Sequence, residues 1–543
     1  MVYLINKVRA FSIKVANDRA IFYYIVAGSA IIIVQIPLFN TNYVWHDDWM
    51  ALERWAEPCF QHGWNGWLIR IGRPLAIGSS CFLQYAMTNS YQLWCPRIII
   101  IIHSIIVMIL LSLCLRRCGM ELLFALLIAV IVVTSPGGLI IWCGLSGLPA
   151  AQSLICICLS FILTLNAAKS WWSANLWRYN IGLYKICLTR NQYGNLQVAA
   201  SGILFLLSLL FYQAVIGIYI ALMFLAICLW ARWQIAKVWY LIFAAIITGL
   251  IAITVYIFLY NAMNGNQLDG LFLHNFGSVD PISKITFLWT TLAPFFLKLW
   301  FIKLPIIVIS IVFVIQFLII IITMIMHRLS YITNTNNIFN TIVIAIIMIS
   351  IPYLSAFSAL GIPGQLLYRT SLGIVLLGLI IWYFWVRGVF MRWYRGDFKL
   401  CRFGVESYLS GIGRSFWTGT ILAIAGIGFW FNELYITRYP EMEVSYIQRV
   451  IMKANDDHKN ITKAYIYLKN APPRRNPALM NDELIFLSTY RTDFTMNEAV
   501  NVIFDRLSLT RPLTTITVPK GPSDYDDGFV IDMNLMSDVP WEP

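Results

Sequence analysis

The sequence predicts an all-α polytopic membrane protein with about eleven transmembrane helices, further helices on its outer surface and a small C-terminal α/β domain. Two observations predict the membrane part. Hydrophobic residues make up 59% of the chain and charged residues only 12%, and the mean hydropathy is +0.72. The apolar residues also gather into runs that are long enough to cross a bilayer. A third observation, the more polar composition after Ile436, predicts the C-terminal domain.

The first apolar run, Ile21–Phe39, is too long for the core of a signal peptide and is followed by many similar runs, so we expect it to be retained as a helix. The later runs are Ile98–Leu115, Leu122–Trp142, Leu148–Asn166, Val198–Tyr212, Ala214–Ala231, Trp239–Tyr260, Pro305–Met326, Ile338–Leu360, Thr370–Val386 and Phe416–Ile436. The stretch Ile282–Trp300 is interrupted by two lysines and a proline, and we expect it to lie in the membrane interface.

Basic residues gather between alternate runs, and this asymmetry predicts the side of the membrane on which each loop lies. With the N-terminus in the cytoplasm, the cytoplasmic segments hold most of the Lys and Arg, for example Arg116, Arg117 and Lys169. Everything after Ile436 then faces the exterior, which in a bacterium is the periplasm. We therefore predict a multi-pass protein of the bacterial inner membrane with a cytoplasmic N-terminus and a periplasmic C-terminal domain.

This division gives a membrane module, residues 1–436, and a soluble domain, residues 437–543. Two external segments of the module, 40–97 and 261–304, are long, and the first is expected to form interfacial helices joined at Gly and Pro. In the soluble domain the pattern predicts helices near Glu441–Asn455 and Asn497–Leu507 and strands at Thr462–Leu468 and Thr514–Val518.

The distribution of charge argues against a nucleic-acid-binding protein, and the cysteines of the first external segment raise the question of a disulfide. The formal net charge is +13, but the excess lies in the membrane module, and this distribution is typical of cytoplasmic anchoring and predicts no nucleic-acid partner. Three cysteines, Cys59, Cys81 and Cys95, share the first external segment. We interpret them as free buried thiols, with one disulfide among them as the alternative.

The candidate catalytic residues are Asp47 and Asp48, which follow the first apolar run. A carboxylate that faces a sugar hydroxyl can remove its proton while the oxygen attacks an activated anomeric carbon. The neighbouring residues Trp45, His46, Trp49 and Glu53 are suited to contacts with a sugar or an acceptor. For the tryptophans, an aromatic belt at the membrane surface is the favoured alternative.

If the leaving group is a phosphate on a lipid, its charge requires cations at the membrane surface. The candidates for this role are Arg369, Lys298, Lys303, Arg73 and Arg70. Arg369 stands at the outer end of its run, where an anchor that reaches the lipid headgroups is an equally good interpretation.

These features resemble the GT-C superfamily of membrane glycosyltransferases. The acidic pair after the first span, the long external loop and the external tail carry the resemblance. Within that superfamily, His46-Asp47-Asp48-Trp49 followed by Gly72-Arg73-Pro74-Leu75 is similar to the bacterial and phage-encoded glucosyltransferases that modify lipopolysaccharide O-antigen and convert serotype. The likeness is at the level of motifs only between Trp45 and Leu75.

The resemblance implies a catalytic base at Asp47 or Asp48 and a phosphate ligand at Arg369. It also implies undecaprenyl-phosphate glucose as donor, lipid-linked O-antigen as acceptor and inversion at the anomeric carbon. Whether a separate donor synthase and a flippase act as partners is left open by the sequence. We expect no cofactor. Some members of the superfamily employ a divalent metal, and Asp269 and Asp280 keep that alternative open.

The alternative functions are a transporter or flippase of lipid-linked sugars, an O-antigen polymerase and a membrane acyltransferase. A transporter is expected to place ionisable residues near the middle of the membrane, whereas the charges here lie at the ends of the apolar runs. A polymerase is expected to rely on Arg in a large late external loop, and an acyltransferase on a His-centred site.

Overall fold

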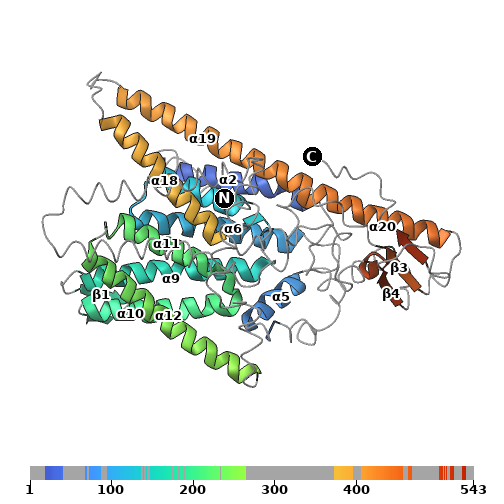
Figure 1. The fold of residues 1–543 in the computed structure, drawn as a ribbon, viewed down its shortest axis with the longest axis horizontal. Helices are drawn as coiled ribbons and strands as arrows, with labels where there is room; N and C mark the ends of the chain where they lie inside the picture. Colours follow the sequence, from blue (N-terminus) through green and yellow to red (C-terminus); the bar gives the residue numbers. More distant parts are fainter. Residues whose placement is uncertain are drawn as a thin grey trace, which may run out of the picture.

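The protein is mainly α-helical, and its helices lie side by side in a bundle (Figure 1). The computed structural model describes residues 19–40, 68–69, 73–86, 94–135, 138–139, 142, 147–172, 177–181, 184–188, 190–232, 234–264, 372–395, 405–456, 463–467, 500–504, 507, 509, 514–518 and 529–532. Among these residues, five helices are long and apolar enough to cross a membrane. These helices indicate a membrane-embedded protein.

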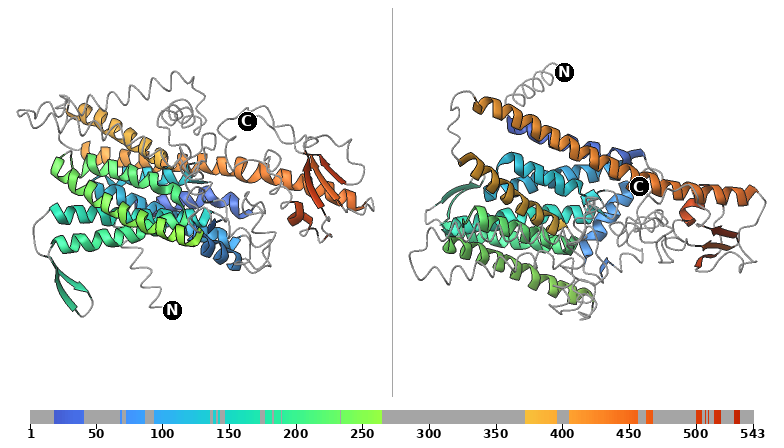
Figure 2. Two further views of the ribbon diagram at one scale, coloured as in Figure 1. Left: turned by 60° about the horizontal axis from the view of Figure 1, so that its bottom comes forward. Right: turned by 45° about the horizontal axis from the view of Figure 1, so that its top comes forward.

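The bundle is built from helices that alternate in direction along the chain (Figures 1 and 2). In chain order they are α2 (Arg19–Asn40), α6 (Trp94–Cys118), α7 (Leu122–Thr134), α9 (Leu148–Trp172), α10 (Arg190–Phe211), α11 (Ile216–Leu229), α12 (Ile235–Asn264), α18 (Leu372–Arg395) and α19 (Val405–Phe431). A 3₁₀ turn, η3 (Gln213–Val215), joins α10 to α11. The apolar runs predicted within the described residues form helices; Pro305–Met326, Ile338–Leu360 and Ile282–Trp300 lie outside those residues.

One predicted run, Leu122–Trp142, is wrong in its length, because α7 ends at Thr134. Ser135 precedes a proline and is extended, with φ −62° and ψ 156°. A residue before proline is pushed out of the helical region by the proline ring, which explains the end of the helix. The chain then packs back on α7, where the buried Trp142 donates a hydrogen bond from Nε1 to the carbonyl oxygen of Val133 at 2.8 Å.

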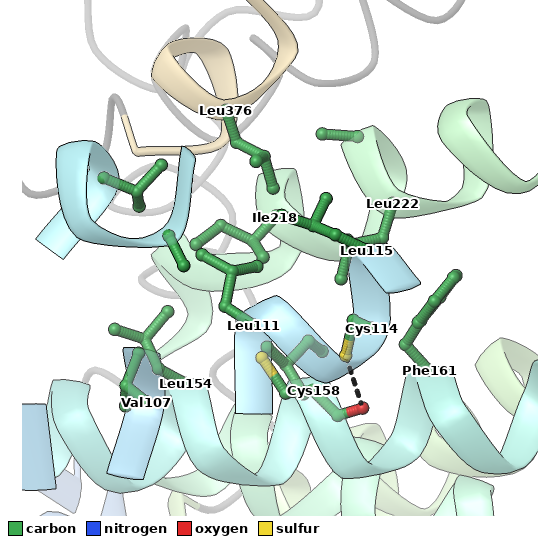
Figure 3. Packing of buried hydrophobic residues seen from close by; sticks show 14 of the residues in the cluster. Val107, Leu111, Cys114, Leu115, Leu154, Cys158, Phe161, Ile218, Leu222 and Leu376 are labelled. Carbon is green, nitrogen blue, oxygen red and sulfur yellow. Dashed lines mark hydrogen bonds between the residues drawn. The ribbon is translucent and has the colours of Figure 1, made fainter. Parts of the chain in front are cut away.

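The core lies where α6, α9 and α11 meet, with α18 against α11 (Figure 3). Leu111 and Leu115 of α6 lie near Ile218 and Leu222 of α11, and Leu376 points toward them from α18. In the same region Cys114 donates from Sγ to the carbonyl oxygen of Cys158 across 3.4 Å. Cys114 and Cys158 are free thiols that act as small buried side chains between α6 and α9.

Hydroxyl groups join α9, α10, α11 and α12 inside the apolar bundle. Thr164 Oγ1 lies 2.8 Å from Ser201 Oγ and 2.8 Å from the hydroxyl oxygen of Tyr219. Ser160 Oγ is 2.8 Å from Ser201 Oγ, and Thr248 of α12 approaches Thr164 at 3.4 Å. Small polar residues let helices approach closely and hydrogen-bond to one another inside a membrane. This network therefore fixes how the four helices pack.

A β-hairpin and a short helix lie at opposite ends of the bundle. The hairpin, β1 (Trp177–Ile181) with β2 (Tyr184–Leu188), is antiparallel and was not predicted. The helix α5 (Pro74–Ala86) lies at the other end (Figure 1) and falls in the segment where interfacial helices were expected. Pro74 begins it, and proline suits the first position of a helix because no hydrogen-bond donor is needed there.

The C-terminal part continues from the bundle without a break in helical structure. The helix α19 passes into a π-helix, η7 (Asn432–Arg438), and then into α20 (Tyr439–Asp456). Pro440 has no N–H to donate to the carbonyl of Ile436, so the regular helical ladder is interrupted here. Three parallel strands, β3 (Lys463–Tyr467), β4 (Thr514–Val518) and β5 (Phe529–Asp532), form a sheet in the order β4-β3-β5. This sheet lies beside α20, beyond the end of the bundle that carries α5 (Figure 2).

Cys81 in α5 corrects one expectation, because it is disulfide-bonded and is not a free thiol. Cys95, at the start of α6, is a free thiol as expected.

Candidate functional site

The candidate site lies at the end of the bundle that carries α5, where several helix ends come together. Asn264, the last residue of α12, donates from Nδ2 to the carbonyl oxygen of Ile69 at 3.2 Å. Gly373, near the start of α18, packs so closely on Gly217 of α11 that an added Cβ would lie 2.4 Å from the Gly217 carbonyl carbon. At this end, α5 also contacts α10, α9 and α6.

Arg73 is held immediately before α5 by two different contacts. Its Nε donates to Gln213 Oε1 at 2.8 Å, and its guanidinium carbon lies 4.3 Å from the centre of the Tyr212 ring. The second contact is a cation–π interaction, in which the negative face of the ring attracts the cation. The main chain is also fixed, because the Arg73 N–H donates to the carbonyl oxygen of Leu68 at 2.8 Å. These contacts therefore fix the direction of the Arg73 side chain.

Gln213 is itself oriented by α12. Its Nε2 donates to the hydroxyl oxygen of Tyr256 at 2.8 Å. An arginine can only donate, so the amide oxygen of Gln213 must face Arg73 and the amide nitrogen must face Tyr256. Gln213 is 9% exposed, Tyr256 7% and Tyr212 4%. The half-buried guanidinium group of Arg73 therefore contacts side chains that are themselves nearly buried.

Further contacts fasten α5 to the bundle independently of Arg73. Ser79 donates from Oγ to Gln152 Oε1 of α9. The side chains of Leu68, Ala76, Ile77 and Cys81 form a small apolar cluster of their own. The position of α5, and with it the start of the Arg73 side chain, does not depend on one hydrogen bond.

Of the predicted site residues, the structure places only Arg73. The others lie outside the described residues: Trp45, His46, Asp47, Asp48, Trp49, Glu53, Arg70, Lys298, Lys303 and Arg369. Asp269 and Asp280, the alternative metal ligands, also lie outside them. Within the described part of the chain, no group of three or more His, Cys, Asp or Glu residues is arranged to hold a metal ion.

Sequence reasoning missed the residues that surround Arg73. Gln213 had a signal, because it is the polar residue between the predicted runs Val198–Tyr212 and Ala214–Ala231. Tyr256 had none, because it lies inside an apolar run. Arg97, in the first turn of α6 at the same end of the bundle, is only 4% exposed and is a buried cation that was not placed in the site.

Asn261 adds an unusual polar atom near the end of α12. Its Oδ1 is buried and has no hydrogen-bond partner. A buried acceptor without a partner costs free energy and is uncommon in native proteins. Asn261 lies between Tyr256, which contacts Gln213, and Asn264, which contacts Ile69.

Comparisons with models of protein families, with curated proteins and with solved structures find no significant match for this chain.

Proposed function

We propose that the protein is an inverting glycosyltransferase of the GT-C type in the bacterial inner membrane. It moves a sugar, glucose by the resemblance of its motifs, from undecaprenyl phosphate to lipid-linked O-antigen on the periplasmic face and so changes the serotype. The proposed membrane module has about eleven crossings. A donor synthase and a flippase are the proposed partners that supply the donor.

The proposed reaction is a single displacement at the anomeric carbon. The acceptor hydroxyl oxygen forms the new bond to that carbon from the face opposite the phosphate, and the bond to the phosphate oxygen breaks with its electron pair. Asp47 or Asp48 takes the acceptor proton as general base. The released polyprenyl phosphate carries more negative charge than the donor, so a fixed cation stabilises the transition state more than the ground state. We propose the step without a cofactor.

The observation that carries this proposal is the position of Arg73. Arg73 belongs to the Gly72-Arg73-Pro74-Leu75 motif and is fixed at the end of the bundle where α12 ends and α18 begins. The chain geometry limits a second candidate, because Arg369 precedes Gly373 by four residues and their Cα atoms can be at most about 14 Å apart. We propose Arg369 as a second phosphate ligand at the same end of the bundle.

Three features support the proposed topology. At the end opposite Arg73, Lys237 lies 5.5 Å from the centre of the Trp172 ring and Lys169 lies 5.9 Å from that of Trp230. Basic and aromatic side chains of this kind are typical of a cytoplasmic membrane interface. The disulfide of Cys81 lies at the Arg73 end and favours an oxidising compartment there. Asn264 and Leu372 lie at that same end, as two crossings between them require.

The C-terminal residues 437–543 are proposed to recognise the acceptor or to cover the site. The position of α20 favours this role, because α20 extends from the bundle at the end where Arg73 lies (Figure 1). A glycan acceptor extends away from its lipid carrier into water, so the protein needs a soluble surface beyond the membrane to contact it.

The direct test of the function is sugar transfer by purified protein in nanodiscs that contain undecaprenyl-phosphate glucose and an O-antigen acceptor. We expect transfer by the wild type. We expect Asp47→Asn or Asp48→Asn to lower the rate by about a hundredfold or more, because loss of a general base costs that much. Both variants must fold, so their thermal unfolding is compared with that of the wild type. Wild-type rates in both variants would refute the assignment of the base.

A further inference from the structure

We propose that the end of the bundle opposite α5 binds an anionic phospholipid, and that this lipid carries two phosphate groups. The site is a cationic cluster where α6, α9 and α11 end and α12 begins. The inference goes beyond the proposed function and does not depend on it, because no step of the proposed sugar transfer uses this end. The five cations of the cluster are Arg116, Arg117, Lys169, Arg232 and Lys237.

Contacts at the end of α9 bring cations from neighbouring elements together. Lys169 Nζ donates to the carbonyl oxygen of Arg117 at 3.0 Å and lies 5.9 Å from the centre of the Trp230 ring. The exposed Arg117 in turn donates from Nη1 to Asn166 Oδ1 of α9 at 3.4 Å. Trp230 directly follows α11, and Arg232 comes two residues later. The charges of α6, of α9 and of the turn between α11 and α12 are therefore neighbours.

Lys237 of α12 forms a second cationic centre at the same helix end. Its Nζ lies 5.5 Å from the centre of the Trp172 ring of α9. Trp172 is three residues after Lys169, and side chains at this spacing on a helix have Cβ atoms about 5–6 Å apart. The two lysine–tryptophan pairs therefore share the end of α9. Two neighbouring cationic centres match a lipid with two phosphates better than a lipid with one.

The cluster carries a net positive charge. The helices that supply or flank its cations, α6, α9, α11 and α12, contain no Asp or Glu. The carboxylate nearest to them in the sequence, Glu121, accepts a hydrogen bond from the hydroxyl of Tyr383 in α18. Cations at a membrane surface attract anionic lipids by about 1 kcal/mol for each Lys or Arg. The cluster therefore favours an anionic ligand.

The backbone of Arg232 is an independent observation that points to a ligand. Its φ is 46°, which is the left-handed region, and among the described residues other than glycine it alone has a positive φ. A side chain in this region costs about 1–2 kcal/mol, whereas glycine adopts it readily. The Arg232 side chain is exposed, so packing inside the protein does not offset this cost. Strain of this kind supports a hypothesis of function, and here the exposed charge is the feature that an anion would use.

The surroundings of the cluster favour a lipid over a soluble anion. Trp172, Trp239 and Tyr240 are exposed beside it, and Trp and Tyr are typical of the membrane interface. One turn further along α12, Phe243 is exposed as well. A phospholipid can place its phosphates on the cations and its acyl chains against this apolar surface. A soluble anion would use the cations alone.

The test titrates the purified full-length protein in detergent micelles with diphosphatidylglycerol, phosphatidylglycerol or phosphatidylcholine, and counts bound lipids by native mass spectrometry. We expect the lowest dissociation constant for diphosphatidylglycerol and the highest for phosphatidylcholine. Equal binding of all three lipids would overturn the anionic-lipid site. Equal binding of the two anionic lipids at matched phosphate concentration would overturn the preference for two phosphates. Displacement of diphosphatidylglycerol by equimolar inorganic phosphate would show a soluble-anion site instead.

Arg232→Gly is the sharpest variant, because glycine suits the backbone at this position. We expect its unfolding temperature without added lipid to equal or exceed that of the wild type. Its dissociation constant for diphosphatidylglycerol should rise about fivefold, which corresponds to about 1 kcal/mol. The matched control is Lys453→Ala, which removes one exposed positive charge from α20 at the other end of the molecule and should leave the dissociation constant unchanged. No rise in Arg232→Gly, or an equal rise in both variants, would overturn the site.

Lys237→Ala tests the two cationic centres separately. It should raise the dissociation constant for diphosphatidylglycerol about fivefold and that for phosphatidylglycerol less, because a single phosphate can occupy the other centre. Thermal unfolding gives a second measurement, since a lipid that binds only the folded protein stabilises it. Diphosphatidylglycerol should raise the unfolding temperature of the wild type more than that of Lys237→Ala. Equal effects of Lys237→Ala on both anionic lipids would contradict the two-phosphate ligand.

Discussion

Thr164 is the residue on which the packing of four helices depends most directly. Its hydroxyl contacts Ser201 and Tyr219, and all three side chains are buried. Thr164→Val keeps the shape of the side chain but removes the hydroxyl, so it weakens contacts between α9, α10 and α11. We expect a loss of about 1 kcal/mol in the free energy of unfolding, the usual value for such contacts inside a membrane. Unfolding in mixed detergent micelles measures it.

Thr134→Val is the matched control for Thr164→Val. Thr134 is also buried, but its hydroxyl donates to the carbonyl oxygen of Val130 in the same helix, at 2.8 Å. That carbonyl belongs to the helix ladder, so the change should leave no group unpaired and have little effect. An equal loss of stability in both variants would contradict the role assigned to the network.

At the scale of single residues, the sequence predicted charges better than it predicted their partners. Arg73 stood out because it lies in the first external segment, in the motif Gly72-Arg73-Pro74-Leu75. Tyr256 did not stand out, since a tyrosine in an apolar run is equally suited to a buried contact or a lipid-facing position. Which of these applies depends on Gln213, which is 43 residues away in sequence and is brought near only by the packing of α12.

At the scale of helices, the close crossing of α11 and α18 fixes where α18 begins. An added Cβ on Gly373 would lie 2.4 Å from the carbonyl carbon and 2.5 Å from the Cα of Gly217. These are backbone atoms and cannot move aside as a side chain would. We expect Gly373→Ala to force the helices apart and to cost about 1–3 kcal/mol in the free energy of unfolding. Since Arg369 precedes this crossing by four residues, sugar transfer should fall as well.

Gly249→Ala in α12 is the control for this prediction. A Cβ on Gly249 would have no atom within 4 Å, and alanine favours a helix more than glycine does. The variant should be as stable as the wild type or slightly more stable, with unchanged transfer. A Gly373→Ala protein as stable and active as Gly249→Ala would show that the close crossing is not required.

The first and last residues of some helices and strands were predicted correctly, and those of others were not. The strand expected at Thr514–Val518 has those bounds in the structure. The end of α7 depends on the restriction that a proline imposes on Ser135, which hydropathy does not register. The hairpin β1–β2 escaped notice because it is short and lies between two long helices in a segment interpreted as a cytoplasmic loop.

At the scale of the whole molecule, the two ends of the bundle differ in chemistry. One end carries α5, Arg73, the disulfide of Cys81 and the helix that leads to the β3–β4–β5 sheet. The other end carries the hairpin and the lysines that lie over tryptophan rings. Transfer of a sugar from a lipid to a glycan on the periplasmic face requires all parts of the site to lie at the first end. The proposed function therefore requires that the end of the bundle with α5 faces the periplasm.

Labelling of single introduced cysteines tests this orientation. Asp456, the last residue of α20, and Arg116, near the end of α6, are both exposed and lie at opposite ends of the molecule. We expect a membrane-impermeant maleimide to label Asp456→Cys in cells with a permeabilised outer membrane, and Arg116→Cys only after the inner membrane is opened. The parent protein gives the background from native thiols such as Cys95. Labelling of Arg116→Cys alone in intact cells would place Arg73 and the C-terminal sheet in the cytoplasm, where O-antigen on the outer face of the membrane cannot reach them.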